Sequence, residues 1–499
     1  MKSLKSIWHF IKMLFYRASL SSLFFFFCCI IFFSIACSKT TPSPTQPDTE
    51  IDSISESGKS PISAIKGRSF LVGNGSGKLL IDGKNFNINK TKITLRAHDT
   101  IRIKEGSYQG ITIQNIQLPK DSTVIITNNG LVQLIGTGLN DGGSGENHQI
   151  KLVNLANVKV LGNGNKKYSH GFLLRDNRYR AIQLEGIFSN FELSYFDFKD
   201  LGDNVIGYDP ENVIYNGSNG TFSENMTFTH LHADNIVELI DFRGWINKDN
   251  DQAIRGLIKH IEVAYIQVTN SPNCGTVIHL HNAQDFDIHH VVLENINTAR
   301  TDHVGIFTIN GPGKIHHNLI NSGWGNAVRA WPSTLGNSPK ELLIYNNIVV
   351  NSLKYSAFEV QPTKEALLSG QTTFTNVKIY NNTCGTLSTK GLVVGKILDA
   401  FDLFGGRYEV FNNLAFNFPF GGKDIKGPFV SYLGVDEHLV KLSNNLYFDT
   451  ATQAGIIDQK EFKLANSSPA KNAGKTYTSL TDDYYGISRG NKPSIGAVQ

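Results

Sequence analysis

Polar and apolar residues alternate in short stretches from about residue 69 to about residue 450. In Thr100–Ile103 the isoleucines fall at every second position, and Ile111–Ile113 repeats this pattern after a glycine. Alternation with a period of two, interrupted by glycine, predicts short strands whose apolar side chains all face one side. No helical period of three to four residues runs through Leu79–Gly162. We therefore expect an all-β fold.

A longer pattern lies over this alternation: an apolar strand, two polar residues at a bend, and a second apolar strand. Leu342–Ser352 is its clearest copy, with Asn346 and Asn347 at the bend. Looser copies upstream have His289-His290 and His316-His317 at this position. The copies repeat every 25 to 35 residues or so, roughly the period that is typical of a solenoid. The aligned apolar positions are Ile288, Ile315, Ile344, Ile379, Val410 and Leu442.

The bend residues have a structural explanation. A tight turn between two strands needs a residue in the left-handed conformation, which asparagine tolerates. Stacked copies also allow the amides of successive coils to hydrogen-bond in a ladder. A metal site at the histidine pairs would need further converging ligands, so we interpret these pairs as bend residues too. The asparagines assigned to this column are Asn318, Asn347, Asn382, Asn413 and Asn445.

Repeated short strands, an asparagine bend and coils of this length resemble the right-handed parallel β-helix of the pectate-lyase-like superfamily. In that fold three short strands form one coil, and each strand stacks on its equivalent about 4.8 Å away. The resemblance implies an all-β, right-handed parallel β-helix over residues 68–455. Ser468–Gly474 and Asp482–Arg489 resemble the closing segment of extracellular members. This implies a C-terminal capping segment over residues 456–499, which would cover the strand edges of the last coil.

Residues 1–37 have the pattern of a lipoprotein signal peptide. Basic residues precede the apolar stretch Leu23–Phe33, and Ser34–Cys37 resembles a bacterial lipobox. We predict lipidation at Cys37, although the apolar stretch is also nearly long enough for an uncleaved membrane anchor. Residues 38–67 are rich in Ser, Thr and Pro and predict a flexible tether. Both alternatives place the remainder outside the cytoplasm, and the lipobox favours attachment to the bacterial outer membrane or cell surface.

Composition narrows the range of partners. The formal net charge is only +4, and no basic run with interleaved aromatic residues is present, which argues against a nucleic-acid partner. Only Cys274 and Cys384 follow the predicted signal peptide. Two cysteines so far apart form neither a disulfide framework nor a metal-binding spacing. We expect buried free thiols and a monomeric protein.

Pectate-lyase-like enzymes generally bind their substrate along the outer face of the first strand of each coil. Alternation places the apolar residues of these strands inward and their neighbours outward. The outward positions hold Arg, His, Trp and carboxylates, and an exposed Trp with hydrogen-bonding neighbours suits sugar rings. We therefore expect a groove that binds polysaccharide. One predicted column is Asp241, His279, Thr308, Arg329 and Glu359, the other is Arg243, His281, Asn310, Trp331 and Gln361, and Asp209 lies on the preceding strand.

Two reactions are compatible with these residues. In β-elimination of a uronic-acid polymer, a base takes the proton next to the carboxylate while a cation stabilises the resulting charge. Arg329 or His279 would be the base, and Arg243 would be the cation. Asp209 and Asp241 would form a Ca²⁺ site of hard oxygen ligands. In hydrolysis, Asp209 and Asp241 on adjacent coils would flank the scissile bond.

These residues predict a lyase or hydrolase of uronic-acid-containing glycans. The fold alone implies no activity, because it hosts lyases, hydrolases, esterases and adhesins. The chain lacks the paired-aspartate, Gly-His-Gly and Arg-x-Lys signatures of polygalacturonase-like hydrolases and the Arg-x-x-Pro-x-x-Arg of pectate lyases. The alternative is a non-catalytic glycan-binding protein or surface adhesin with the same groove. The predicted catalytic residues are Asp241, His279 and Arg329, and the predicted substrate-binding residues are Arg243, His281, Asn310, Trp331, Glu359 and Gln361.

Overall fold

The computed structural model describes residues 67–138, 148–210, 212–247, 253–362, 375–391, 393–419 and 427–499. These residues belong to one compact unit, Ala64–Gln499. The predicted signal peptide, Cys37 and residues 38–66 of the predicted tether lie outside the described ranges. Within the described residues, no helix is long and apolar enough to span a membrane.

The N-terminal coils are built from strands that often continue through a bend. In chain order these strands are β1 (Ser69–Val72), β2 (Ser76–Asp82), β5 (Thr100–Gln114), β6 (Val124–Gly138), β7 (Ile150–Val153), β8 (Ala156–Leu161), β9 (Phe172–Asn177), β10 (Ile182–Glu185), β11 (Ser189–Tyr208), β13 (Ser223–Phe242), β16 (Ile258–Ser271), β17 (Thr276–Leu280), β18 (Ala283–Gln284) and β19 (Phe286–Ile296). β5 pairs in parallel with β1, β2 and β6, and β13 pairs in parallel with β11 and β16. Each coil therefore lies in register on the one before it.

From β20 onward each coil consists of three separate strands. The first strands are β20 (Gly305–Asn310), β23 (Asn326–Trp331), β26 (Phe358–Val360), β29 (Leu398–Phe401) and β32 (Val430–Leu433). The second are β21 (Gly313–His316), β24 (Lys340–Tyr345), β27 (Thr375–Tyr380), β30 (Tyr408–Phe411) and β33 (Val440–Ser443). The third are β22 (Leu319–Gly323), β25 (Ile348–Ser352), β28 (Thr383–Gly385), β31 (Leu414–Phe416) and β34 (Leu446–Phe448).

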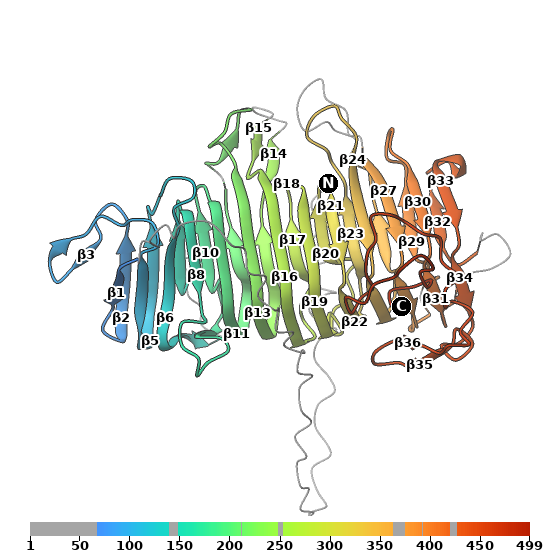
Figure 1. Cartoon of the computed structure of the whole chain (residues 1–499), viewed down its shortest axis with the longest axis horizontal. Coiled ribbons are helices and arrows are strands. Elements are labelled where there is room, and N and C mark those ends of the chain that lie inside the picture. The colour runs from blue at the N-terminus through green and yellow to red at the C-terminus, as the bar shows by residue number, and fades with distance from the viewer. Residues whose placement is uncertain are drawn as a thin grey trace, which may run out of the picture. The chain divides into compact units, whose positions relative to one another are not determined.

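Up to β31, each of these strands pairs in parallel with the third strand after it, as β20 does with β23 and β23 with β26 (Figure 1). The chain thus returns to the same face after every three strands. One hydrogen-bonded sheet joins 29 strands in this way. The predicted right-handed parallel β-helix is confirmed.

The remaining elements are short and lie outside this sheet. They are the pairs β3 (Asn87–Ile88) with β4 (Thr91–Lys92) and β35 (Ile456–Asp458) with β36 (Lys463–Leu464), the sheet of β12 (Ile214–Tyr215), β14 (Trp245–Asn247) and β15 (Ala253–Arg255), and the 3₁₀ helix η1 (Glu437–Leu439).

Stacked apolar side chains fill the interior of the coils. The register pairs Ile288 with Ile315, and the same column continues through the aligned positions to Leu442. Every member is fully buried except Leu442, which is 40% exposed because no described strand follows it in this column. The alignment of the repeats is therefore confirmed. Cys274 and Cys384 are buried free thiols, as predicted.

The asparagine ladder is confirmed, and the position of the left-handed residue is corrected. Asn347 Nδ2 donates to Asn382 Oδ1 at 3.0 Å, and Asn382 Nδ2 donates to Asn413 Oδ1 at 3.0 Å. The left-handed residue is instead the first of each pair, with φ of 50° at both Asn346 and Asn381. The second asparagine turns inward because its amide also donates to a main-chain carbonyl of the preceding coil.

Histidine and tyrosine occupy the same bend in the upstream coils. His290 and His317 have φ of 53° and 54°, so they take the left-handed position that asparagine holds later. Their rings stack 5.2 Å apart, with 7° between the planes. The neighbouring His289 and His316 stack 5.0 Å apart, with 8° between the planes. We call these four residues the histidine ladder. His290 and His317 lie at the bend, whereas His289 and His316 lie on the strand before it, in the column that continues at Tyr345.

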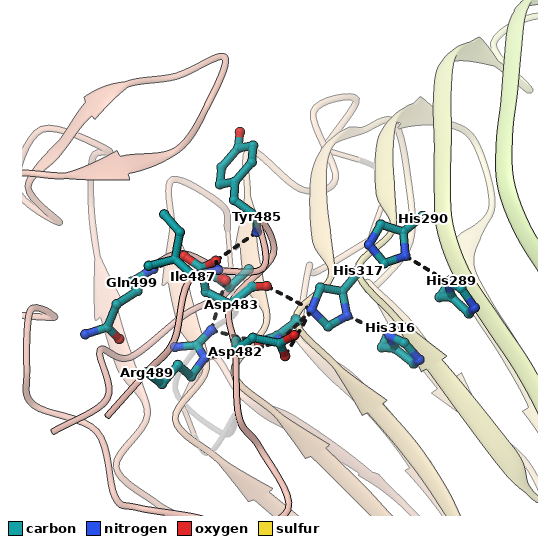
Figure 2. Close-up of polar contacts among 12 residues, drawn as sticks. His289, His290, His316, His317, Asp482, Asp483, Tyr485, Ile487, Arg489 and Gln499 are labelled. Atoms are coloured by element: carbon teal, nitrogen blue, oxygen red, sulfur yellow. Dashed lines mark hydrogen bonds and ion pairs between the residues drawn. The ribbon is translucent and has the colours of Figure 1, made fainter. Parts of the chain in front are cut away.

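The segment that the sequence predicts as a cap of the last coil also lies along the bends. Figure 2 shows the carbonyl oxygen of Asp483 beside His317, 2.9 Å from its Nε2. Arg489 Nη2 donates to Asn346 Oδ1 at 2.7 Å. The apolar residues Ile495 and Val498 pack in one cluster with side chains of β25, β31 and β34. The segment therefore runs back over earlier coils, because the bend column offers it polar partners.

Candidate functional site

The register places the two predicted columns on successive coils. Asp241 is paired with His279, His279 with Thr308, Thr308 with Arg329, and Arg329 with Glu359. In the second column, Asn310 is paired with Trp331. Because adjacent coils are about 4.8 Å apart, Asp241 and Arg329 are separated by three steps, or about 14 Å. The structure brings the predicted catalytic residues Asp241 and His279 together and places Arg329 in a second cluster.

The first cluster is centred on the carboxylate of Asp241, at the end of β13. This side chain is buried, and its Oδ2 accepts hydrogen bonds from Arg243 Nε at 2.6 Å and Asn204 Nδ2 at 2.7 Å. Its Oδ1 is buried and accepts no hydrogen bond from any residue that the structure describes. Burial by itself would raise the pKa of Asp241, but His279 and Arg243 outweigh this and hold the pKa well below its usual range. Asp241 is therefore an anion whose Oδ1 has room for a closer partner than the His279 ring, 3.4 Å away.

His279 and His281 face this carboxylate from the next coil. His279 Nδ1 lies 3.4 Å from Asp241 Oδ1 and 3.6 Å from Glu238 Oε1. Burial opposes the charged ring, but the two carboxylates outweigh it and raise the pKa of His279 to about 9. The ring of His281 is 4.1 Å from that of His279. Burial, and next the charge on His279, lower the pKa of His281 to about 4.

Three side chains of this cluster have the spacing of metal ligands. One nitrogen or oxygen atom from each of Asp241, His279 and His281 lies within 4.8 Å of the others. Among the described residues this is the one group of three or more His, Cys, Asp or Glu side chains with such spacing. The predicted Ca²⁺ pair does not form part of it, because Asp209 is ion-paired with Arg180.

The second cluster is built on Glu359, in β26. The sequence predicts a solvent-facing residue here, but Glu359 is only 3% exposed. Arg329 Nε donates to its Oε1 at 2.8 Å, His303 Nε2 lies 2.8 Å from its Oε2, and Gln361 donates to Oε1. Burial opposes the charge, but hydrogen bonds from His303 and Arg329 lower the pKa of Glu359. Glu359 therefore positions the outer side chains rather than meeting a substrate itself.

Aromatic rings and cations cover this second carboxylate. The Arg329 guanidinium lies 5.0 Å from the ring centre of Trp331. The ring of Tyr355 stacks on His303 at 3.9 Å, with 15° between the planes. Lys354 Nζ is 4.8 Å from the centre of the Tyr355 ring. Half-buried rings beside cations suit sugar rings that carry negative charge.

Three residues of these clusters lie outside the predicted columns: Asn204, Glu238 and His303. Asn204 and Glu238 belong to β11 and β13, but they precede the aligned columns by three positions. Asn204 and Glu238 are paired with each other across the two coils. Extending the aligned columns by three positions would therefore have found both residues. His303 lies before β20, in a connection that has no counterpart in the repeat. Asn310 is half-buried at the end of β20, between the two clusters.

Parallel coils with outward polar columns define a pectate-lyase-like right-handed β-helix. Residues 216–390 match the family model described as rhamnogalacturonase A/epimerase, pectate lyase-like. This stretch contains every predicted catalytic and substrate-binding residue, whereas Asp209 and Cys37 lie before it. No curated protein matches the sequence of the chain.

Solved structures resemble the chain at low identity. The pectate lyase Pel9A is 12% identical with a TM-score of 0.42, and the alignment covers 85% of this chain and 96% of that one. A family PL6 polysaccharide lyase from Pseudopedobacter saltans is 12% identical with a TM-score of 0.39, over 77% and 94% of the two chains. The periplasmic alginate epimerase AlgG is 9% identical with a TM-score of 0.32, over 70% and 77%. At this identity the similarity concerns the fold alone.

Proposed function

We propose that the protein cleaves an acidic polysaccharide by β-elimination at Asp241, Arg243, His279 and His281. One observation carries this proposal: a half-exposed guanidinium lies beside two histidines on an outward strand face. The Arg243 side chain is 51% exposed, and the buried Asp241 fixes its Nε. A guanidinium with free N–H groups is the side chain best suited to hold a sugar carboxylate.

The two histidines supply the proton transfers. Because their rings are 4.1 Å apart, a charge on one disfavours a charge on the other. His279 lies between Asp241 and Glu238 and therefore takes the charge, which leaves His281 neutral. His281 accepts the proton from the carbon next to the carboxylate, and the bond from the neighbouring carbon to the glycosidic oxygen breaks. His279 gives its proton to that oxygen, and an unsaturated sugar end results.

Arg243 contributes the electrostatic part of the reaction. Proton removal next to a carboxylate places negative charge on the carboxylate oxygens, and a fixed guanidinium stabilises this charge. The family model that matches the chain includes rhamnogalacturonase A and epimerase in its description, which supports an acidic glycan as substrate. Arg329, Trp331 and Tyr355 of the second cluster would hold sugar units further along the same chain.

Hydrolysis is less favoured by the geometry. It needs two carboxyl groups that both reach the scissile bond. Asp209 is ion-paired with Arg180, and Asp241 and Glu359 are both buried. A glycan-binding protein without turnover would use the second cluster alone. We also propose that a lipid on Cys37 holds the folded unit at the bacterial cell envelope, where such polymers occur outside the cytoplasm.

The test is to incubate the full chain with a panel of uronic-acid polymers. We expect the absorbance of unsaturated products to rise in step with new reducing ends. Arg243→Ala should abolish this signal, whereas Arg175→Ala should leave it intact. Arg175 is a similar half-exposed arginine, paired with Asp176 on a coil outside the cluster. Reducing ends without unsaturated products would overturn β-elimination in favour of hydrolysis, and binding without either product would favour a glycan-binding protein.

A further inference from the structure

We infer that Asp241, His279 and His281 form a binding site for a borderline divalent metal ion such as Zn²⁺ or Co²⁺. One potential ligand atom from each side chain lies within 4.8 Å of the others, so a single ion can contact all three. The second observation is independent of this spacing. Asp241 is 2% exposed, and among the described residues its buried Oδ1 accepts no hydrogen bond, with His279 Nδ1 facing it at 3.4 Å. An unsatisfied buried carboxylate oxygen is costly unless a further partner completes it.

The surroundings of Asp241 are those of a metal ligand with outer-shell support. Arg243 and Asn204 both donate to Oδ2, which fixes the carboxylate plane and leaves Oδ1 toward the histidines. Glu238 Oε1 lies 3.6 Å from His279 Nδ1, the nitrogen that also faces Asp241 Oδ1, so it adds a second carboxylate beside the site. The carboxylates of Asp241 and Glu238 together outnumber the one guanidinium, so the site keeps a negative balance when both rings are neutral.

The donor set selects the class of ion. Two imidazoles and one carboxylate suit Zn²⁺, Co²⁺ and related first-row ions, whereas Ca²⁺ prefers six to eight oxygen ligands. Three protein ligands also leave at least one position of the ion open. His279 and His281 are only half-buried, so this position is reached from solvent.

Metal binding has a consequence for catalysis that rests on the proposed function. A nitrogen bound to the ion cannot accept or donate a proton. The ion and the β-elimination therefore compete for His279 and His281. We expect bound Zn²⁺ to prevent proton transfer by His279 and His281. Zinc should therefore inhibit the enzyme, and a chelator should restore its activity.

Binding is measured first, without reference to activity. Co²⁺ is titrated into the full chain, and its visible absorption reports nitrogen and oxygen ligands. We expect one ion per chain, displaced by Zn²⁺. His281→Ala should remove the absorption without unfolding the protein, because it deletes a half-buried ring and leaves no buried charge. Asp241→Asn, which keeps the shape of the buried side chain, should weaken Co²⁺ binding at least tenfold.

The matched control is His438→Ala. His438 is a highly exposed histidine beside Asp436 at η1, and its loss should leave Co²⁺ binding unchanged. No absorption in the full chain, or absorption that persists in His281→Ala, would overturn the metal site.

The activity arm separates the two proposals. One equivalent of Zn²⁺ should reduce turnover at least tenfold, and unchanged or increased turnover would overturn the inhibition. If Co²⁺ binds as described while no polymer is cleaved, the metal site stands and the proposed function fails.

Discussion

The histidine ladder and the first cluster, around Asp241, both contain paired histidines, but the ladder is scaffold and the cluster is a candidate site. In the ladder, His289 and His316 stack in register, with 8° between their planes, and His290 and His317 do so with 7°. In the groove, His279 and His281 come from one strand end, and their planes are tilted by 41°. In the ladder, His290 and His317 take the bend position that asparagine holds in later coils. His279 instead lies in an outward column and faces the carboxylate of Asp241.

The two regions also differ in how their polar atoms are satisfied. His317 Nε2 lies beside the carbonyl oxygen of Asp483 (Figure 2). His316 Nε2 lies 2.9 Å from Asp287 Oδ1. The ladder is therefore complete within the described structure, and its burial stabilises the fold. Asp241 Oδ1 accepts no hydrogen bond from the described residues and faces His279 Nδ1 only at 3.4 Å. A buried polar atom without a hydrogen bond, rather than the presence of histidine, distinguishes the candidate site from the scaffold.

The largest expected effect is on catalysis. His281→Ala should lower kcat/KM by roughly 10²–10⁴-fold, because it removes the base. His290→Asn should leave activity intact, because asparagine already holds the left-handed position in later coils. Both variants should keep the thermal midpoint of the parent chain within a few degrees. Product absorbance and thermal melts measure these outcomes, and equal activity losses in both variants would erase the distinction between groove and ladder.

The next effect concerns the segment that lies over the bends. The buried Arg489 donates to Asn346 Oδ1 and to the carbonyl oxygens of Ser494, Gly496 and Ala497. Arg489→Ala should lower the free energy of unfolding by about 3 kcal/mol, because several buried acceptors lose their donor. Urea denaturation measures this change.

The control for this variant is Arg407→Ala, at an exposed position before β30, which should change stability by less than about 0.5 kcal/mol. Polysaccharide cleavage should persist in Arg489→Ala under conditions where it is folded. If Arg407→Ala lowered the free energy of unfolding as much as Arg489→Ala, residues 456–499 would not depend on the buried arginine for their stability.

Acidification should reduce the stability contributed by the histidine ladder more than the stability contributed by the first cluster. Burial, and next the charges of His316 and His290, lower the pKa of His317 to about 3. The unfolded chain binds this proton near pH 6.5, so the unfolded state takes up more protons between pH 6.5 and 3, and stability falls as pH decreases through this window. Between pH 7 and pH 5 the loss should be about 2 kcal/mol.

The test of this pH dependence is His317→Asn, which places at this coil the residue that later coils use. Urea midpoints of the two chains are compared at pH 7 and pH 5. The variant should lose less stability on acidification than the parent chain. Parallel pH profiles would show that His317 does not govern the acid response.

Repetition explains which parts of the structure could be predicted from the sequence. The column from Ile288 to Leu442 recurs often enough to determine strand register, and the register alone assigns the outward columns. Burial of an outward residue depends on what covers it. Glu359 is hidden because Arg329 and His303 reach across to it, and His303 belongs to a connection without a repeat. The path of residues 456–499 depends on contacts with distant bends, which no local pattern encodes.

The smallest effect separates the second cluster from the first. Trp331 packs against Arg329 at 5.0 Å, about 14 Å along the coils from Asp241, which is a distance of several sugar units. Trp331→Ala should raise KM for long polymers by a few-fold, equivalent to about 1 kcal/mol, while kcat stays unchanged, because uniform binding is lost and no proton transfer is touched. Short oligomers that fill only the first cluster should show no change.

Phe404→Ala, at an exposed aromatic position away from both columns, is the control. A fall in kcat for short oligomers would place Trp331 at the reacting bond and merge the two clusters into one site.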